Sequence, residues 1–222
     1  MSEIPELLLI DKPLGITSMD VIRRLRRILN IKKIGHAGTL DPLATGLMLV
    51  GVGPGTKKLM DLVKLDKEYV AEVRIGERRT TGDMEGAIVE EKEVTSLTQQ
   101  EVSDALLSLL GSVELPVSAY SAIKVDGTPM YKRARKAERN GEVVTDLPLR
   151  TMRIDEVELL SFSMADGRAV ATVRFSVGSG TYIRSLGEEL GTRLGYPAVL
   201  QNLRRTKVGQ FNIKDAKKLE EI

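Results

Sequence analysis

The sequence contains no cysteine, no tryptophan and only one histidine. Disulfide bonds are therefore excluded, and a structural zinc site with the usual cysteine and histidine ligands cannot be assembled. No apolar run approaches the roughly 20 residues that a membrane-spanning helix needs. The first residues, MSEIPELLLIDKP, carry acids where a signal peptide carries basic residues. We expect a cytoplasmic protein that has no membrane partner.

The balance of charge is close to neutral, with 33 lysine and arginine residues, 31 aspartate and glutamate residues and a net charge of +2. Such a chain does not attract a polyanion through its net charge, so any surface for nucleic acid must be local. A chain of 222 residues that is 42% hydrophobic and 29% charged is long enough for one substantial core. One or two domains are compatible with this length.

Apolar spacing, together with glycine and proline punctuation, predicts a mixed α/β domain. Thr17 and Ser18 can cap one helix, and residues 98–101 form a capping box before another. Because strands often follow strands directly, much of the sheet should be antiparallel. Helices are expected at about residues 18–29, 102–110, 129–141 and 183–194. Strands are expected at about residues 7–10, 47–52, 69–75, 143–162 and 170–177.

Two of the expected helices carry clusters of basic residues. One has Arg23, Arg24, Arg26 and Arg27 on the arc opposite its apolar face, and the other is basic from Lys132 to Arg139. Each cluster alone is more typical of a solvated face than of a binding site. Two such clusters on a nearly neutral chain favour a phosphate-binding surface.

A glycine-rich segment, Gly35 to Gly46, surrounds one carboxylate with glycines, a proline and hydroxyl residues. Pro42 disfavours the α-helical region at Asp41, and the glycines permit backbone geometries closed to other residues. The segment could therefore hold the Asp41 carboxylate rigidly and present it to a ligand. The alternative is an ordinary turn, because aspartate, proline and glycine are common turn formers.

Other chemistries fit the sequence poorly. Residues 51–58 follow an apolar strand, but a phosphate-binding P-loop needs glycine where Thr56 stands. His36 is not accompanied by the Gly-x-Ser-x-Gly elbow of a serine hydrolase. Arg184 stands near the start of a helix, where it is either a surface arginine or the charge partner that keeps a buried carboxylate ionised.

Several short segments match the pattern of one family, in the same order along nearly the whole chain. They are Asp11 to Ser18, Gly35 to Gly46, Lys67 to Tyr69, Thr81 to Gly86, Tyr120 to Gly127, Gly180 to Arg184 and Leu203 to Thr206. Together these segments resemble the TruB family of tRNA pseudouridine synthases. Each segment alone is weak, but agreement of order and spacing across the chain is specific.

The resemblance implies that Asp41 is the catalytic nucleophile, Arg184 its salt-bridge partner and Tyr69 the ring that stacks on the target base. These roles suit the residue types, because a carboxylate can attack C1′ of the ribose or act otherwise in detaching the base, and an aromatic face can hold a detached uracil. The substrate-binding residues that the resemblance implies are His36, Tyr182, Ile183, Leu203, Lys12, Lys132 and Arg133. The side chains at positions 182, 183 and 203 would equally suit a core. The isomerisation needs no redox group, metal or nucleotide, so no cofactor is expected.

The resemblance also implies a pseudouridine synthase fold of the α+β type, with a central, largely antiparallel mixed sheet flanked by helices. One catalytic domain is expected for residues 1–222, with an RNA-clasping insertion at about residues 112–145 and without the C-terminal PUA-like domain of relatives. The expected partner is the T-stem-loop of tRNA, bound by a monomer that needs no protein partner. Residues 115–119 depart from the family pattern, since LPVSA stands where relatives have glutamine and paired prolines.

Two other functions share parts of this pattern. An RNA-binding protein would keep the scaffold without catalysis. A nucleoside glycosidase would share Asp41 but would release free uracil. The presence of Asp41 together with Tyr69 and Arg184 favours the isomerase over a scaffold that only binds RNA.

Overall fold

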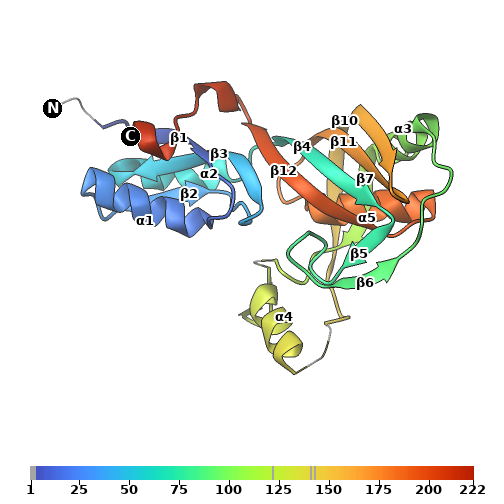
Figure 1. The fold of residues 1–222 in the computed structure, drawn as a ribbon. Helices are drawn as coiled ribbons and strands as arrows, with labels where there is room; N and C mark the ends of the chain where they lie inside the picture. Colours follow the sequence, from blue (N-terminus) through green and yellow to red (C-terminus); the bar gives the residue numbers. More distant parts are fainter. Residues whose placement is uncertain (1–3, 122, 141, 143) are drawn as a thin grey trace. The chain divides into compact units, whose positions relative to one another are not determined.

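The computed structural model describes residues 4–121, 123–140, 142 and 144–222. The chain forms two compact units. Unit 1 comprises the residues up to Val70 together with Arg174–Gly180 and Asn202–Ile222, whereas unit 2 comprises Ala71–Val173 and Thr181–Gln201. Figure 1 labels most of the helices and strands along the chain.

Most strands belong to one mixed sheet with the order β1-β3-β12-β4-β11-β10-β7, in which β2 also pairs with β3 and β13 with β12. β12 is parallel to β3, whereas β1 and β2 are antiparallel to β3, β13 to β12 and β7 to β10. The prediction of a mixed, largely antiparallel sheet flanked by helices is confirmed. The strands are β1 Leu7–Lys12, β2 Ile34–Ala37, β3 Ala44–Val52, β4 Lys67–Ile75, β7 Gly111–Pro116, β10 Leu149–Ala165, β11 Arg168–Val177, β12 Ala198–Val208 and β13 Phe211–Asn212.

Helix α1, Ser18–Leu29, buries its apolar face in unit 1 and contacts β2. Thr17 accepts a hydrogen bond from the Asp20 amide, and the Asp20 carboxylate accepts one from the Thr17 amide. This capping box satisfies backbone donors that would otherwise lack partners at the helix start. Val21 and Leu25 are fully buried, as their spacing predicts, whereas the arginines of the helix lie exposed.

Strand β3 forms the centre of the unit 1 core. Leu47 and Leu49 pack with Ala37 of β2 and Val208 of β12, and all four residues are buried. Helix α2, Leu59–Leu62, contributes leucines to the same cluster. The remaining short turns of helix are η1 Gly53–Lys58, η2 Ile213–Asp215 and η3 Leu219–Glu221.

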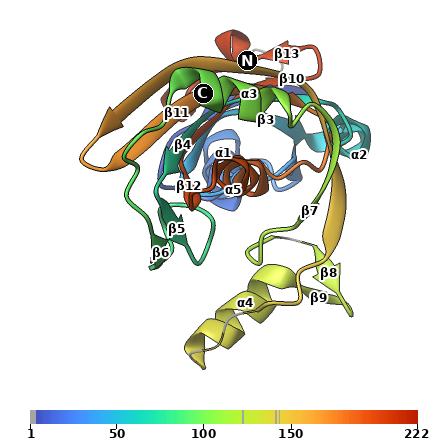
Figure 2. The same ribbon diagram turned by 90° about the vertical axis from the view of Figure 1, so that its right-hand side faces the viewer.

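In unit 2, two helices pack beside the strands and contact each other. Helix α3, Gln99–Leu107, lies against β10, and helix α5, Ile183–Leu194, lies against β7 (Figure 2). Two small antiparallel sheets complete the unit. Their strands are β5 Glu77–Arg79 with β6 Ile88–Glu91, and β8 Lys124–Val125 with β9 Thr128–Pro129, which leads into helix α4, Met130–Arg139.

The structure corrects several local expectations. The helix expected up to residue 110 ends at Leu107, and Gly111, with a φ of 94°, opens β7. Part of the glycine-rich segment is the strand β2, which pairs with β3. Strand β12 was not expected, because its adjacent arginines interrupt the apolar pattern. The expected helix end at Gly141 and strand start at Val143 lie outside the described residues.

Candidate active site

The segment between β2 and β3 holds Asp41, a partly exposed residue of unit 1. Just before it, the hydroxyl of Ser18 donates to the carbonyl oxygen of Leu40 at 2.9 Å and accepts from the Leu40 amide at 2.8 Å. Just after it, the carbonyl oxygen of Pro42 accepts from the Gly15 amide at 2.9 Å. The backbone is therefore held on both sides of Asp41, as a presented carboxylate requires.

A buried arginine, Arg205 of β12, anchors the same segment. Its side chain is almost fully enclosed, with Nε donating to the carbonyl oxygen of Leu47 at 2.7 Å and Nη2 donating to that of Gly38 at 3.1 Å. The two acceptor residues, Gly38 and Leu47, lie before and after Asp41 in the sequence. Arg205 therefore acts as a positioning residue for the segment.

Gly46 permits the close approach of β12 to β3. It faces Arg205 in the parallel register, and a Cβ atom on Gly46 would lie 2.3 Å from the backbone oxygen of Arg205. The φ of Gly46 is also +105°, a conformation that side chains disfavour. Both constraints require glycine where the segment that carries Asp41 enters β3.

Lys67 opens β4 and lies on the same buried face as Tyr69, because alternate residues of a strand face one side. Its ammonium donates to the carbonyl oxygens of Val63 at 2.7 Å and Leu65 at 2.6 Å. Burial, aided by the neighbouring Arg205 cation, lowers the pKa of Lys67 to about 8. The start of the strand that carries Tyr69 is thus fixed by a buried amine.

The lowered pKa of Lys67 makes stability depend on pH in a defined direction. Between about pH 8 and the ordinary value of 10.5, the unfolded chain holds a proton at Lys67 that the folded chain has lost. Raising the pH through this window should therefore stabilise the wild-type protein relative to Lys67→Met, by up to roughly 3 kcal/mol. Urea unfolding of both proteins near pH 7 and pH 10 measures the difference.

The control for this prediction is Lys64→Met, because Lys64 lies in the turn just before β4 and its side chain is 71% exposed. Its stability relative to the wild type should not vary with pH across the window. If the free energy of unfolding of the wild type relative to Lys67→Met stays constant or falls as the pH rises, the lowered pKa of Lys67 is contradicted.

His36 lies in β2 and carries a shifted pKa. Burial lowers the pKa of His36 below its usual value of 6.5, the Arg205 cation lowers it further, and a hydrogen bond with the Gly38 backbone opposes both effects. Nδ1 of His36 is buried and has no hydrogen-bond partner within the described residues. The lowered pKa favours the neutral imidazole, a form suited to hydrogen bonding rather than to binding phosphate by charge.

Arg184 is buried in unit 2, near the start of α5. Nη1 donates to the carbonyl oxygen of Thr81 at 3.0 Å, and Nη2 donates to that of Tyr120 at 3.3 Å. The Asp83 carboxylate, also buried, lies 3.5 Å from Nη1. Asp83 is therefore a charge partner of Arg184 within unit 2. The pairing of Arg184 with Asp41, a residue of the other unit, stays a prediction.

Lys12 is fully buried in unit 1. Its ammonium donates to the carbonyl oxygens of Pro13 at 2.9 Å, Ile16 at 2.7 Å and Pro42 at 3.4 Å. This geometry favours a role in holding the backbone beside Asp41 over direct contact with a substrate.

The other residues expected in the uracil pocket occupy different places. Tyr182 is the N-cap of α5, and the next residue, Ile183, is 4% exposed; both belong to unit 2. Leu203 is a half-buried residue of β12 in unit 1. Their contact with uracil stays a prediction.

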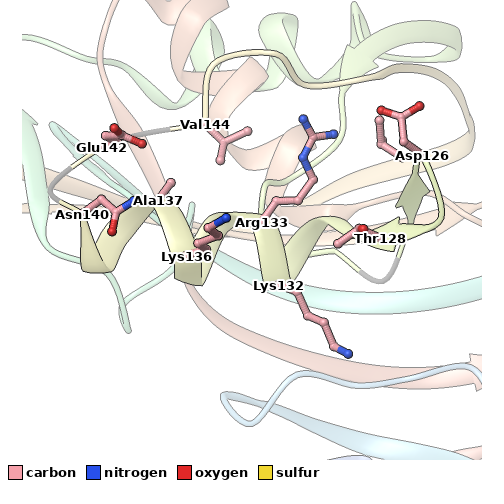
Figure 3. Close-up of a pocket in the computed structure, with 10 residues that line it drawn as sticks. Asp126, Thr128, Lys132, Arg133, Lys136, Ala137, Asn140, Glu142 and Val144 are labelled. Carbon is pink, nitrogen blue, oxygen red and sulfur yellow. The ribbon is translucent and has the colours of Figure 1, made fainter.

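A basic pocket lies beside α4 in unit 2 (Figure 3). Its lining includes the basic residues Lys132, Arg133 and Lys136 together with the acids Asp126 and Glu142. Figure 3 shows Lys132 and Arg133 leaving the helix in different directions. Nη1 of Arg133 is buried and has no hydrogen-bond partner among the residues that the structure describes. An anion that enters the pocket would satisfy this donor.

Sequence reasoning missed several residues that hold the site. Arg205 and Lys67 fall inside segments that match the family, but nothing in the sequence marks them as buried cations. Ser18 was identified only as a helix cap, and Asp83 only as part of a turn.

Across the described part of the chain, no cluster of histidine and carboxylate side chains suits a metal ion. No helix there has the length and apolar character to cross a membrane.

Comparison with known sequences gives consistent matches. The family description TruB family pseudouridylate synthase (N terminal domain) matches residues 26–183. The tRNA pseudouridine synthase B of Mycobacterium sp. (strain KMS) is 42% identical over 216 residues, covering 97% of this chain and 71% of that protein. The protein of the same name from Leifsonia xyli subsp. xyli is 44% identical over 216 residues, covering 96% of this chain and 70% of that protein.

Comparison with solved structures leads to the same class. A chain from the structure of an H/ACA RNP bound to a substrate RNA containing 2′-deoxyuridine is 26% identical, with a TM-score of 0.68. The match covers 96% of this chain and 51% of that chain, so this chain spans about half the length of that solved protein. Fold and sequence together define the class of pseudouridine synthases. Within that class, the chain belongs to the TruB family of pseudouridylate synthases.

Proposed function

We propose that this chain isomerises uridine to pseudouridine in the T-loop of tRNA, with Asp41 as the nucleophile. The observation that carries the proposal is the hydrogen-bonded segment that holds a partly exposed Asp41 in place. Membership of the family supports the same reaction, and relatives at 42% identity are named tRNA pseudouridine synthase B. In this reaction uracil leaves C1′ through N1, turns, and rejoins C1′ through C5. The proton lost from C5 is balanced by one gained at N1.

The proposed roles follow from the chemistry of each side chain. The Asp41 carboxylate attacks the nucleotide as the glycosidic bond breaks. Arg184 keeps that carboxylate ionised, since a guanidinium remains charged at any physiological pH. Tyr69 stacks on the uracil while the ring turns. The residues that complete the base pocket in this proposal are His36, Tyr182, Ile183 and Leu203.

The target uridine must leave the stacked loop before the chemistry, and protein contacts offset the free energy of that unstacking. The proposal places phosphates of the RNA in the α4 pocket, where the buried Nη1 of Arg133 lacks a partner among the described residues. Residues 112–145 act as the insertion that clasps the RNA. The enzyme works as a cytoplasmic monomer and needs no protein partner.

The experiment that tests this function measures tritium released from C5 of uridine in a tRNA transcript. The wild-type chain should release one tritium per transcript, and a transcript with cytidine at the target position should release none. Nucleoside analysis of the product should find pseudouridine in place of the target uridine. Free uracil would favour a glycosidase, and RNA binding without release or product would favour the scaffold that only binds RNA.

Replacing Lys132 and Arg133 by alanine tests the phosphate contacts of α4. Each phosphate contact releases counterions, so losing two contacts should reduce the slope of log affinity against log salt by up to about 2. The salt dependence of tRNA binding, followed by fluorescence anisotropy, measures this slope. The matched control is alanine at Lys57 and Lys58, exposed residues of unit 1, and an unchanged slope in the α4 variant would reject the contacts.

A further inference from the structure

Helix α1 and the residues just after it carry a second basic surface. Arg24 and Arg27 of the helix, and Lys32 and Lys33 beyond its end, are all exposed, and we refer to these four residues as the α1 basic face. In the described part of the chain, none of the four forms an ion pair with a carboxylate. The one ion pair on the helix joins Arg23 to Asp20.

The charge of this face is unusual for the chain. Residues 18–33 hold six basic residues and one acid, more positive charge than the net +2 of the whole sequence. Basic residues in the last turn of a helix are favourable because they face the negative end of the helix dipole. That effect accounts for Arg27, but it does not account for Arg24 in the middle of the helix or for two lysines beyond it.

The α1 basic face also opposes helix stability. Arg24 and Arg27 are three positions apart, and Arg23 and Arg27 four positions apart, so like charges face one another on the same side of the helix. No acid at these spacings relieves the repulsion except Asp20, which pairs with Arg23. Helix stability therefore does not explain the positive charge of this surface, whereas attraction of a polyanionic ligand would explain it.

Hydrogen bonds tie α1 to the segment that carries Asp41. Ser18, at the start of the helix, both donates to and accepts from the backbone of Leu40. Arg26 donates through Nη2 to the carbonyl oxygen of Ile34, the first residue of β2, at 2.9 Å. All of these residues belong to unit 1. An RNA helix bound on the α1 basic face would therefore lie at a fixed position relative to Asp41.

We infer that the α1 basic face binds the phosphate backbone of double-helical RNA that flanks the target loop. The inference rests on the proposed function, because that function supplies the RNA. Helix α1 has 12 residues and is about 18 Å long, enough to follow several phosphates along one strand. Contacts of this kind carry no sequence information and would position the RNA without selecting it.

The test combines a change in the protein with a change in the RNA. The variant is Arg24→Gln with Arg27→Gln, which removes two charges while keeping residues of similar helix propensity. The matched control is Lys57→Gln with Lys214→Gln, two exposed lysines of unit 1 outside α1. Two stem-loop transcripts share one target loop, and one of them has a longer stem. Their affinities are measured by fluorescence anisotropy at several salt concentrations.

The wild type should bind the long-stem RNA more tightly than the short-stem RNA. The α1 variant should lose about tenfold in affinity for the long-stem RNA at about 0.1 M salt, with a salt slope lower by about 2. Its affinity for the short-stem RNA and its rate at saturating RNA should equal those of the wild type. The control variant should behave as the wild type throughout. The melting temperature of the α1 variant should be unchanged or higher, because charge repulsion has been relieved.

Equal binding of the long-stem RNA by the wild type and the α1 variant would overturn the inference. Binding to vesicles of phosphatidylglycerol is measured for the same proteins. If the α1 variant binds these vesicles more weakly than the wild type but binds both RNAs as the wild type does, the inference is overturned in favour of an anionic membrane. Failure of the proposed function is a separate result, since the wild type would then form no pseudouridine on either RNA. The affinities still report on the α1 basic face in that case.

Discussion

Replacing Asp41 by asparagine is expected to lower the rate of pseudouridine formation by at least about 10⁴-fold, the scale seen when a nucleophile is removed. The amide keeps the shape of the side chain but carries no negative charge, so it cannot attack the nucleotide. RNA affinity should change by less than about threefold, because the backbone bonds of the segment are retained. Tritium release in a single turnover, with enzyme in excess over labelled tRNA, measures the rate independently of product release.

The control for this prediction is Asp61→Asn, a change of the same chemistry at a side chain of unit 1 that is 87% exposed. It should release tritium at the wild-type rate. Similar release by Asp41→Asn and the wild type would exclude Asp41 as the nucleophile, even if the protein proves to be a pseudouridine synthase. A rate loss accompanied by a lower melting temperature would instead indicate disturbed folding, so both proteins are melted alongside the assay.

Local signals in the sequence predicted helices α1 and α5 well. The helix expected at residues 183–194 is α5, and Gly195 takes the left-handed conformation that ends it. The start of α1 was also predictable, because Thr17 and Asp20 lie close enough in sequence to form a capping box. Such signals act within one helical turn, so they can be recognised without knowledge of the tertiary structure.

Strand β12 could not be predicted because its environment is formed by distant segments. Residue 203 faces residue 44 in the register with β3, across more than half of the chain. Arg204 and Arg205 break the apolar pattern that usually marks a strand. Arg205 is nevertheless buried, because carbonyl groups far from it in sequence accept its hydrogen bonds. Burial of a cation depends on such partners, which no local pattern reveals.

In the candidate site, too, features set by neighbouring residues could be predicted, whereas contacts between distant residues could not. The concentration of glycine and proline around Asp41 left both a held carboxylate and an ordinary turn open, and the bonds to Leu40 and Pro42 favour the first. Lys12 is completely buried and donates to three carbonyl groups, and its expected contact with the substrate stays a prediction. Asp83 was missed as a partner of Arg184, because their 3.5 Å approach depends on the packing of a turn against α5.

Replacing Arg205 by methionine is expected to lower kcat/KM by about a hundredfold, the usual effect of a small misplacement of a reacting group. The change removes the hydrogen bonds to Leu47 and Gly38 that lie on either side of Asp41. The free energy of unfolding should change by less than about 2 kcal/mol, since lost hydrogen bonds are partly offset by removal of a buried cation. Arg204→Met is the matched control, because that neighbour is partly exposed and pairs with Asp11.

The pKa of His36 distinguishes a positioning role for Arg205 from general damage. His36 is the only histidine in the chain, so its imidazole gives one set of signals in an NMR titration. Because the Arg205 cation lowers the pKa of His36, Arg205→Met should raise that pKa toward the usual value, while Arg205→Lys should leave it low. The lysine variant cannot donate to both carbonyl groups as the guanidinium does, so it should still lose activity. Full activity in Arg205→Lys, or an unmoved His36 titration in a folded Arg205→Met protein, would contradict this account of how the Asp41 segment is held.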